Sequence, residues 1–565
     1  MKKVIPVVVA LVLILIIGGV AVGMYLIDKY SYSKEAADLD EYFQVSGEQL
    51  AIIMQDEILA DKALSRNGTC YFELSTVHAY MNEVFYADKA EGILLYATDV
   101  DVIRTVFGES TASSAQGSED LGYIPAFIEN DTVYVAAEYV ERFTNYSYTV
   151  YEKHVQVITK WESNLMAAVL KKTAVRLRGG VKSPVIRNME AGEQVEVLEM
   201  MESWSKIKTS DSYIGYVENK FLDSQTEVED VPVTHYQEPE YTSILMEGKL
   251  CLGWHSIGGT AGNDTLDSVA AESKGMNVIA PTWFSLSDNE GNFRSFATAD
   301  YVTKAHAYGL QVWGVLDDFN YNIENNAGID VYEILTSTSK RQNLIEKIIE
   351  AAVSYGLEGI NLDFEKVTSE SGIHYVQFLR EISAACRNAG LVLSVDNYVP
   401  LNFNEYYRLD IQGVLVDYVI IMGYDEHWGG SGNPGSVASI NYVENGIKKT
   451  LESVPAEKVI NALPLYTRVW KIDGAVVTDD SLSVRNTADF LSRVNAEPEW
   501  DEETCQNYAE WTSGSATYKL WIEDEESIEV KLKVMSVQNI GGVAVWRLGG
   551  GTEIVWELIR AYVEQ

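Results

Sequence analysis

The sequence predicts an α/β protein whose C-terminal part is a (β/α)8 TIM barrel with an insertion subdomain between strands 7 and 8. Two small β-rich domains and an N-terminal transmembrane helix are expected before it. After residue 246, apolar β segments alternate with amphipathic helical patterns, which is typical of such a barrel, with an open doubly wound sheet as the alternative. Between residues 70 and 223 the β segments are short and closely spaced, and residues 4–27 form one uncharged apolar run.

The N-terminal apolar run indicates a membrane anchor over residues 1–30. It reaches the roughly 20 residues that a membrane span needs, and Lys2 and Lys3 precede it. A cleaved signal peptide would have a shorter apolar region and a small-residue site, which only residues 21–23 weakly resemble. We therefore expect a single-pass protein of the cell membrane, in contact with the lipid bilayer, whose large C-terminal remainder is extracytoplasmic.

Length and charge limit the classes of partner. The 565 residues exceed one core, and 43 basic against 83 acidic residues give a formal charge of −40. That much negative charge repels nucleic acid, so no nucleic acid partner is expected. The four cysteines are scattered without a CxxC pattern, which predicts no metal site.

Two small domains are expected between the anchor and the barrel. Residues 31–165 read as a β-rich envelope or stalk domain, within which the polar run 109–120 is expected to be a loop. This domain weakly resembles the amine-oxidase N-terminal domain. Residues 170–225 have short strands, Trp204 and polar turns, and resemble a bacterial SH3-like domain. Residues 226–245 are an acidic, proline-containing linker, and 246–565 are the barrel, with the insertion at about 470–535.

The fourth β segment of the barrel carries polar residues on one face. It reads GLEGINLDFEK from 356 to 366, so Gly359, Asn361, Asp363 and Glu365 alternate with Ile360, Leu362 and Phe364. Polar residues facing inward at the end of a barrel strand are typical of a catalytic site, whereas a solvated edge strand is the alternative.

Other strand ends supply further chemistry to the same mouth of the barrel. The sixth segment ends in Met422, Tyr424 and Asp425, the seventh carries Tyr466, and the eighth carries Trp546. Carboxylates together with aromatic side chains indicate a carbohydrate site, because acids cleave glycosidic bonds and aromatic rings pack on sugar faces.

These motifs resemble glycoside hydrolase family 18. Its DxxDxDxE signature is similar to the fourth segment, with Glu358 and Asn361 in place of the first two aspartates. The MGYD element at 422–425, PLYTR around Tyr466 and VAVWRLG around Trp546 resemble other strand motifs of the family. The form GINLDFE resembles the bacterial spore-cortex and cell-wall branch.

The resemblance implies roles for the site residues. Glu365 would protonate the leaving oxygen, Asp363 would orient the 2-acetamido group of the substrate, and Tyr424 would hydrogen-bond its carbonyl. The remaining predicted site residues would bind substrate: Asp425, Met422, Trp546, Tyr466 and Asn361. The family uses the acetamido oxygen as nucleophile, which implies a retaining reaction without a metal or organic cofactor.

The sequence therefore predicts a membrane-anchored glycosidase of the family 18 type. Its expected partner is a polysaccharide that contains N-acetylglucosamine (GlcNAc), with peptidoglycan preferred and chitin as the alternative substrate. Two other interpretations stay open, a catalytically silent glycan-binding protein and an N-terminal adhesion or assembly module that carries the barrel as a passenger.

Overall fold

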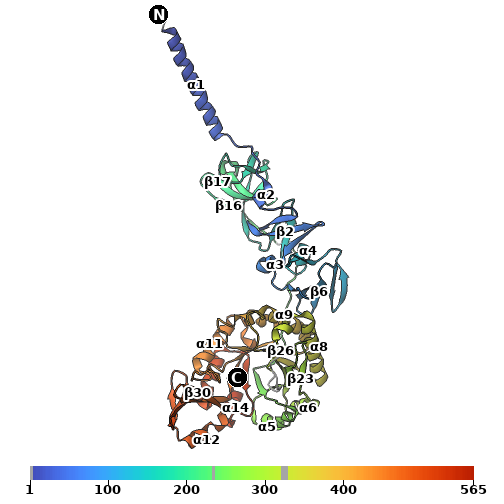
Figure 1. Ribbon diagram of the computed structural model, residues 1–565, viewed down its shortest axis with the longest axis vertical. Coiled ribbons are helices and arrows are strands. Elements are labelled where there is room, and N and C mark those ends of the chain that lie inside the picture. The colour runs from blue at the N-terminus through green and yellow to red at the C-terminus, as the bar shows by residue number, and fades with distance from the viewer. Residues whose placement is uncertain (1–3, 232–233, 235, 320–328) are drawn as a thin grey trace. The chain divides into compact units, whose positions relative to one another are not determined.

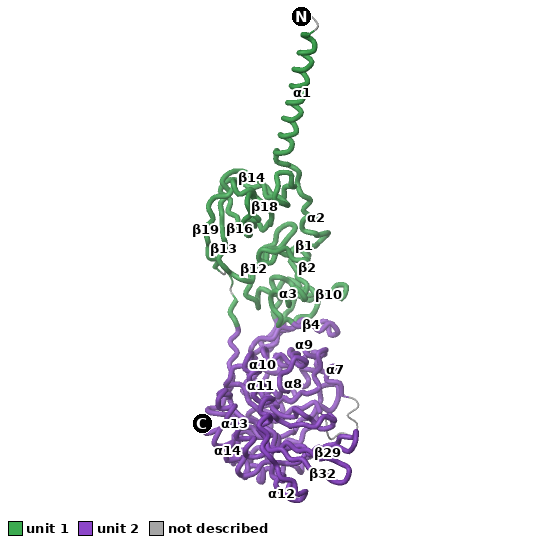
Figure 2. Tube along the Cα trace, turned by 90° about the vertical axis from the view of Figure 1, so that its left-hand side faces the viewer, with its two compact units in different colours: residues 1–85, 105–112, 119–238 green, residues 86–104, 113–118, 239–565 purple. Residues whose placement is uncertain are grey.

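The computed structural model describes residues 4–231, 234, 236–319 and 329–565 of the chain. These residues divide into two compact units, which Figure 2 colours separately. One unit contains residues 1–85, 105–112 and 119–238, and the other contains residues 86–104, 113–118 and 239–565. The predicted barrel lies in the second unit.

The N-terminal apolar run forms one long helix, α1 (Ile5–Tyr30). Pro6 lies in its first turn, where a proline is tolerated, and none of its residues is buried. The helix is long and apolar enough to cross a bilayer, a test that a signal sequence also passes. The structure thus provides a candidate membrane span at the predicted place.

The first β-rich domain is built on a seven-stranded sheet in the order β11-β12-β1-β2-β3-β10-β9. Its apolar residues face the short helices α2 (Leu39–Phe43), α3 (Leu74–Tyr80) and α4 (Ala137–Glu141). The strands are β1 (Gln49–Met54), β2 (Glu57–Arg66), β3 (Thr69–Glu73), β9 (Ala126–Glu129), β10 (Thr132–Ala136), β11 (Ser147–Val150) and β12 (His154–Ile158).

A second seven-stranded sheet, in the order β15-β14-β18-β17-β16-β13-β19, forms the SH3-like region. Alternate residues of its strands, among them Val175, Val195, Ile207 and Val217, make one small core. The elements are β13 (Ser163–Ala168), β14 (Thr173–Arg176), β15 (Val185–Met189), β16 (Gln194–Met200), β17 (Trp204–Thr209), β18 (Ile214–Glu218), η1 (Asn219–Phe221) and β19 (Thr226–Glu229).

Part of the predicted stalk domain belongs to the barrel unit. Residues 86–104 and 113–118 are counted with it, and they hydrogen-bond to its helices. Asp88 accepts from the backbone N–H and the hydroxyl of Thr338, both at 2.8 Å, and the Tyr86 hydroxyl lies 2.6 Å from a ring nitrogen of His374. The segment contains β4 (Tyr86–Asp88) and β5 (Ile93–Ala97), and it includes parts of β6 (Val102–Val106), β7 (Thr111–Ser114) and β8 (Gly117–Asp120).

Eight parallel strands close into a barrel, as predicted. Each strand pairs with its neighbours in chain order, and β34 returns to pair with β20. The strands are β20 (Leu250–His255), β21 (Val278–Pro281), β24 (Gln311–Asp317), β25 (Gly359–Asp363), β26 (Val392–Tyr398), β27 (Tyr418–Met422), β28 (Val459–Pro464) and β34 (Gly542–Trp546). A short hairpin, β22 (Phe284–Leu286) with β23 (Phe293–Ser295), extends from β24.

Large side chains fill the inside of the barrel below the strand ends. Trp254, Trp313 and Tyr418 belong to this interior core. Gly359 on β25 leaves room for the indole of Trp313, since a Cβ at this glycine would lie 2.9 Å from Trp313 Cδ1 and 2.8 Å from the carbonyl oxygen of Val392. The barrel is therefore a packed core whose polar residues gather at one end.

Helices surround the barrel sheet, as Figure 1 shows for the part of the chain drawn in green to red. The apolar stripe of each helix faces the strands, and helices α8 and α9 end at Gly356 and Gly390, both in the left-handed region that favours glycine. The helices are α5 (Leu266–Glu272), α6 (Ala299–Ala307), α7 (Val331–Thr336), α8 (Thr338–Tyr355), α9 (Gly372–Ala389), α10 (Leu409–Leu415), α11 (Ile440–Leu451), α13 (Glu525–Gln538) and α14 (Glu553–Val563), with the short η2 (Thr260–Thr265), η3 (Glu405–Tyr407) and η4 (Ala456–Lys458).

The insertion between barrel strands 7 and 8 is a five-stranded antiparallel sheet with one helix. The sheet order is β30-β29-β33-β32-β31, and Val469, Leu520 and Ile522 form its apolar cluster. Its elements are β29 (Tyr466–Asp473), β30 (Val476–Ser483), α12 (Val484–Val494), β31 (Glu499–Asp501), β32 (Gln506–Ser513) and β33 (Ala516–Ile522). Tyr466 therefore begins the inserted sheet and does not lie within barrel strand 7.

One buried ion pair joins helices α8 and α9, and its loss should destabilise the barrel. Arg341 is fully buried, and its guanidinium donates to both oxygens of Glu381 at 2.9 to 3.2 Å. We expect Glu381→Gln to lower the free energy of unfolding by about 3–5 kcal/mol, because it leaves a buried cation without its counter-charge. Urea unfolding of the parent and the variant measures the loss.

Glu333→Gln is the matched control for this prediction. Glu333 is half exposed and lies 3.9 Å from Lys340, so its replacement should change stability by less than about 1 kcal/mol. Equal stability losses for both variants would contradict the importance of the buried pair.

Candidate active site

A cavity of about 470 Å³ opens at the C-terminal ends of the barrel strands. In a (β/α)8 barrel this is the face that carries catalytic side chains. Six of the eight predicted site residues line it, namely Asp363, Glu365, Met422, Tyr424, Asp425 and Trp546. The structure thus brings six predicted residues from three strands to one cavity.

The end of β25 is held in place by a buried carboxyl from the neighbouring strand. Asp318 follows β24 and accepts hydrogen bonds from the backbone N–H groups of Glu365, at 3.2 Å, and Lys366, at 2.8 Å. Asp318 is fully buried, which raises the pKa of its carboxyl to about 6. These contacts fix the backbone that carries Glu365 as it leaves the strand.

Glu365 has the properties of a general acid. Burial raises the pKa of Glu365 to about 7, and the nearby charges of Asp318 and Asp425 act in the same direction. The Tyr398 hydroxyl donates a hydrogen bond to Glu365 Oε2, which favours the charged form and limits the rise of this pKa. A carboxyl with a pKa near 7 carries a proton that it can donate at neutral pH.

Asp363 is the last residue of β25, two residues before Glu365, and it is more deeply buried than Glu365. Burial and the charges of Glu365 and Asp396 raise the pKa of Asp363 well above its usual range. Its Oδ1 atom is buried and has no hydrogen-bond partner among the described residues. This oxygen is available to a donor brought in by a substrate.

Asn361 lies beneath the cavity, where sequence reasoning expected a substrate-binding residue. It is fully buried and does not line the cavity. Its side-chain amide donates to Ser394 Oγ at 3.0 Å and to Asp396 Oδ1 at 2.8 Å, and its oxygen accepts from Trp254 Nε1 at 2.8 Å. Asn361 therefore organises the groups below the catalytic carboxyls.

The end of β27 supplies the next set of side chains. Met422 closes the strand, and Tyr424 lies in the same cavity with its ring 6.3 Å from that of Tyr466. Asp425 has a positive φ of 56° and accepts from Tyr466 Oη at 2.6 Å and from Arg468 Nη2 at 3.3 Å. Tyr466 does not line the cavity, so it orients Asp425 from the inserted sheet.

Two tryptophans form an apolar floor in the cavity. Trp546 is the last residue of β34, and its ring meets that of Trp254 at 6.1 Å in an edge-to-face arrangement. Trp254 in turn hydrogen-bonds Asn361, which ties this floor to the carboxyl cluster. An aromatic surface beside paired acids suits the apolar face of a sugar ring.

Several functional residues are added by the structure. Asp317 lines the cavity and accepts from Ser285 Oγ at 2.9 Å, while Tyr398, Asp396, Arg294 and Trp254 line it as well. In the sequence, Asp317 and Asp318 end the apolar run 310–316, a position that suits either the mouth of a barrel or the cap of a following helix. Asp317 lines the cavity, and Asp318 binds the backbone that follows β25. Helix α7 is capped by Asp330 instead.

Within the described ranges, no three His, Cys, Asp or Glu side chains are grouped so as to hold a metal ion. The acids of the cavity are spread over the ends of β24, β25, β26 and β27, and two of them accept hydrogen bonds from the hydroxyls of Ser285 and Tyr398. The arrangement can donate a proton from Glu365 and hold a polar group of a substrate against Asp363.

Comparisons with known proteins agree with this site. Residues 325–551 match the model of glycosyl hydrolases family 18, and residues 171–223 match that of the bacterial SH3 domain. The chain is 26% identical over 325 residues to an uncharacterized glycosylase, YvbX, of Bacillus subtilis, which covers 54% of this chain and 90% of that protein. It is 28% identical over 248 residues to the cortical fragment-lytic enzyme of Bacillus anthracis, 42% of this chain and 57% of that one.

Solved structures share the fold. The spore cortex-lytic enzyme SleL of Bacillus cereus superimposes with a TM-score of 0.50 at 22% identity, over 59% of this chain and 78% of that one. The C-terminal domain of a putative chitinase from Desulfitobacterium hafniense gives a TM-score of 0.50 at 15% identity, over 56% of this chain and all of that domain. The residues matched by the family model, 325–551, include strands β25 to β34 and most of the acids of the cavity, and they form a domain of the glycosyl hydrolases family 18 type.

Proposed function

We propose that this protein is a membrane-anchored, extracytoplasmic glycosidase that hydrolyses β-1,4 bonds of a GlcNAc-containing glycan with retention of configuration. The observation that carries the proposal is the placement of Asp363, at the end of β25, and Glu365, two residues later, in one cavity, with the pKa of Glu365 raised to about 7. Bacterial peptidoglycan is the preferred substrate, and chitin is the alternative.

The first step is proton donation by Glu365 to the glycosidic oxygen. Its pKa near 7 keeps it protonated at the start, and the Tyr398 hydroxyl stabilises the carboxylate that forms. Glu365 then takes a proton from the water that completes hydrolysis. One residue thus serves as acid and later as base.

The nucleophile is the 2-acetamido oxygen of the substrate itself. Asp363 ends β25 and Glu365 follows two residues later, roughly 6–7 Å away between Cα atoms for an extended chain, so both reach the sugar from the same strand end. Two carboxyls from one strand end do not flank the sugar ring from opposite sides, which fits the substrate-assisted exception to the two-carboxylate scheme. The unpartnered Oδ1 of Asp363 would accept the acetamido N–H.

Helix α1 supports the anchored location. It is a 26-residue apolar helix with no buried residue, and lipid would cover its exposed side chains. Expression of the chain with and without residues 1–30, followed by membrane fractionation, tests the anchor. Release of the full-length chain as a shortened soluble form would mean that the helix is a cleaved signal.

The cell wall is preferred as substrate for two reasons. The names of two relatives, a cortical fragment-lytic enzyme and a spore cortex-lytic enzyme, refer to bacterial cortex. An SH3 domain of the bacterial type accompanies the barrel in the same chain. If helix α1 anchors the chain in the membrane, the barrel would act on glycan close to the cell surface, which in bacteria is the cell wall.

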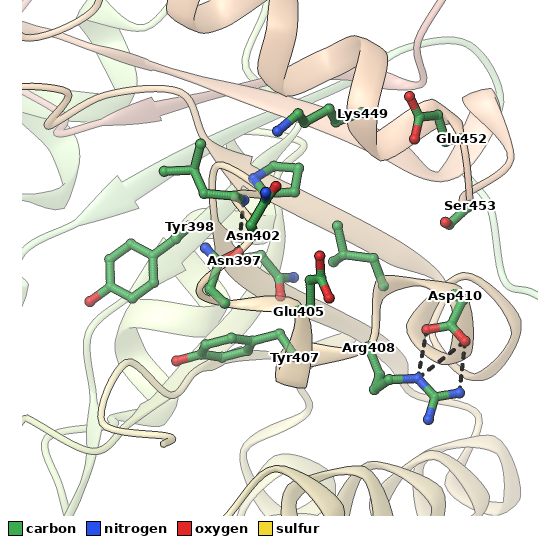
Figure 3. Close-up of a pocket in the computed structure, with 14 residues that line it drawn as sticks. Asn397, Tyr398, Asn402, Glu405, Tyr407, Arg408, Asp410, Lys449, Glu452 and Ser453 are labelled. Carbon is green, nitrogen blue, oxygen red and sulfur yellow. Dashed lines mark hydrogen bonds and ion pairs between the residues drawn. The ribbon is translucent and has the colours of Figure 1, made fainter. Parts of the chain in front are cut away.

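A groove beside the catalytic cavity adds a chemical reason. It has a volume of about 410 Å³ and shares Tyr398 with the cavity. Figure 3 shows Lys449 and Glu452 on one side of it and Glu405 on the other, and none of these three charges has an ion-pair partner in the part of the chain that the structure describes. Chitin is uncharged and offers these three side chains no ionic partner, whereas the stem peptides of peptidoglycan carry carboxylates and amines.

Removal of the unpaired groove charges should reduce activity only on peptide-bearing glycan. For Lys449→Ala combined with Glu405→Gln we expect kcat/KM on such strands to fall by about two- to fivefold, which is the range of exposed charge contacts. The same strands stripped of peptide, and chitin oligomers, should be cleaved at the parental rate. Initial rates on the three substrates measure the effect.

Lys448→Ala is the matched control for the groove. Lys448 precedes Lys449 on α11 but pairs with Glu444 and does not line the groove. It should leave all three rates unchanged. An equal loss of kcat/KM on stripped and peptide-bearing strands would show that the groove charges do not select peptide-bearing glycan.

Activity should also fall on the alkaline side of neutrality. Glu365 acts in its protonated form, and its raised pKa of about 7 keeps that form present at lower pH, so kcat/KM is expected to decline as pH rises through about 7. Tyr398→Phe removes a hydrogen bond that lowers this pKa, so the alkaline limb should move to higher pH. A pH series of kcat/KM for both proteins measures the shift, and a limb that stays in place would contradict the contact.

The proposed function is tested by product analysis. The purified ectodomain and its Glu365→Gln form are incubated with wall muropeptides and with chitin oligomers, and new reducing ends are identified by mass spectrometry. New GlcNAc reducing ends from the parent alone are expected. Cleavage of chitin alone would overturn the wall assignment, and binding without cleavage of either substrate would favour the catalytically silent glycan-binding alternative.

A further inference from the structure

Asp396 on β26 lies beside Asp363 on the adjacent, hydrogen-bonded strand β25. Leu362 and Val395 are partners in the parallel ladder, so Asp363 and Asp396 occupy the next position of the register. The hydrogen bond from Asn361 to Ser394, two residues earlier on each strand, shows that these alternate residues share the inner face. Both carboxyls line the cavity.

No positive charge neutralises this pair. Neither Asp363 nor Asp396 forms an ion pair with Lys, Arg or His in the described ranges of the chain. Burial raises the pKa of Asp396 well above its usual range, as it does for Asp363, and the charge of Glu365 adds to both. The groups that act on their pKa values are acids and phenols, namely Asp317 and Asp318 from β24, and Tyr375 and Tyr424. Arg294 also lines the cavity but forms no ion pair with either carboxyl among the described residues.

Two facing carboxyls without a cation favour a state that holds one proton between them. The hydrogen bonds agree with this, since Asp396 Oδ1 accepts from Asn361 while Asp363 Oδ1 is buried without a donor. Asn361 stands where the resembled signature has an aspartate, so the carboxyl is missing from β25 and present on β26.

We propose that Asp396 holds the proton that Asp363 gives up when positive charge develops on the substrate's acetamido group. This inference rests on the proposed substrate-assisted reaction. As the acetamido oxygen bonds to the anomeric carbon, the proton passes from Asp363 to Asp396, and the negative charge passes from Asp396 to Asp363. The pair keeps one proton and one negative charge throughout, and the proton returns when water opens the cyclic intermediate.

This exchange leaves the proton of Glu365 for the leaving oxygen. If Glu365 were the only partner of Asp363, one proton would have to serve both the glycosidic oxygen and the acetamido partner. Asp396 acts through Asp363 and does not need to touch the substrate, so it is a positioning residue. Asn361 orients Asp396 with its amide and is itself oriented by Trp254.

The kinetic test uses Asp396→Asn, which preserves shape and the acceptor for Asn361. We expect kcat to fall by about 100-fold, with KM changed less than about twofold, because charge stabilisation is lost in the transition state alone. The loss should be the same on a chitin oligomer and on an aryl GlcNAc glycoside, whereas a Glu365→Gln loss should shrink on the aryl glycoside, whose leaving group needs less acid assistance. Activity of Asp396→Asn within about threefold of the parent would overturn the inference.

The exchange variant Asn361→Asp with Asp396→Asn protects the test against a folding defect. It returns a carboxyl to β25 and places the amide on β26, so the 361–396 hydrogen bond persists with its roles reversed. We expect kcat to recover to within about tenfold of the parent. A double variant no more active than Asp396→Asn would contradict proton sharing.

Asp417→Asn is the control, since Asp417 is another buried carboxyl, at the N-terminal end of the strands, where it accepts from the backbone N–H of Leu393. Its kcat should equal that of the parent.

An infrared measurement separates this inference from the proposed function. In a Glu365→Gln background, a carbonyl band of a protonated carboxylic acid should persist at about pH 8, where ordinary carboxyls are ionised. The band should shift or vanish on Asp396→Asn and stay unchanged on Asp417→Asn. A parent that cleaves no GlcNAc glycan would defeat the proposed function alone, while the absence of this band would defeat the proton sharing.

Discussion

Glu365→Gln is expected to lower kcat on a GlcNAc polymer by about 10³- to 10⁴-fold, at the upper end of what a general acid contributes. The amide keeps the size of the side chain and can still meet the Tyr398 hydroxyl, but it has no proton to give to the leaving oxygen. Steady-state rates on a soluble chitin oligomer measure the loss.

Two comparisons make this result specific to proton donation. The loss should be at least about tenfold smaller on an aryl glycoside with an acidic leaving group. The affinity for the oligomer should stay within about threefold of the parent, since the residue contributes mainly to the transition state. An unchanged kcat would require another acid, and Asp317 and Asp425 are candidates because both line the cavity.

Asp363→Asn is expected to lower kcat by about 10²- to 10³-fold. Asp363 would face the acetamido group with the buried Oδ1, and an uncharged amide there cannot stabilise the positive charge that forms as the ring closes. Rates on an oligomer and on an aryl glycoside measure the loss, which should be equal because the leaving group is not involved.

A substrate without the N-acetyl group provides the control. The parent should cleave a de-N-acetylated oligomer poorly, and Asp363→Asn should reduce that residual rate by less than about threefold. A large additional loss on the de-N-acetylated substrate would assign Asp363 to a role outside acetamido handling.

Much of the barrel can be predicted from sequence because local pattern and position agree there. Apolar runs that end in polar residues mark β25, β27 and β34, and each is followed or preceded by a helical pattern. The catalytic candidates Glu365 and Asp363, together with Tyr424 and Trp546, stand at those ends and do meet in one cavity.

What sequence cannot supply is the pairing across strands. Asp396 and Tyr398 stand at the end of β26, and no local pattern shows which residues they contact. The register with β25 places Asp396 beside Asp363, and a hydrogen bond joins Tyr398 to Glu365. Asp318 acts on the backbone of a different strand, which no local pattern records.

Two boundaries also depend on long-range contacts. The sequence predicts a loop for the polar run 109–120, but Thr111–Ser114 and Gly117–Asp120 are strands. Ser, Ala and Gly have weak strand preference, so pairing with the neighbouring strands of the sheet determines their conformation. Residues 86–104 join the barrel unit through contacts such as Asp88 with Thr338, 250 positions away.

The central claim is that the acetamido group of the substrate is the nucleophile, and the anomeric form of the first product tests it most directly. Proton NMR during the first moments of cleavage of a β-linked GlcNAc oligomer distinguishes the two anomers before they equilibrate. The account predicts that the new reducing end appears as the β anomer, since two displacements at the same carbon retain configuration. A first product in the α form would contradict it and would require direct attack by water.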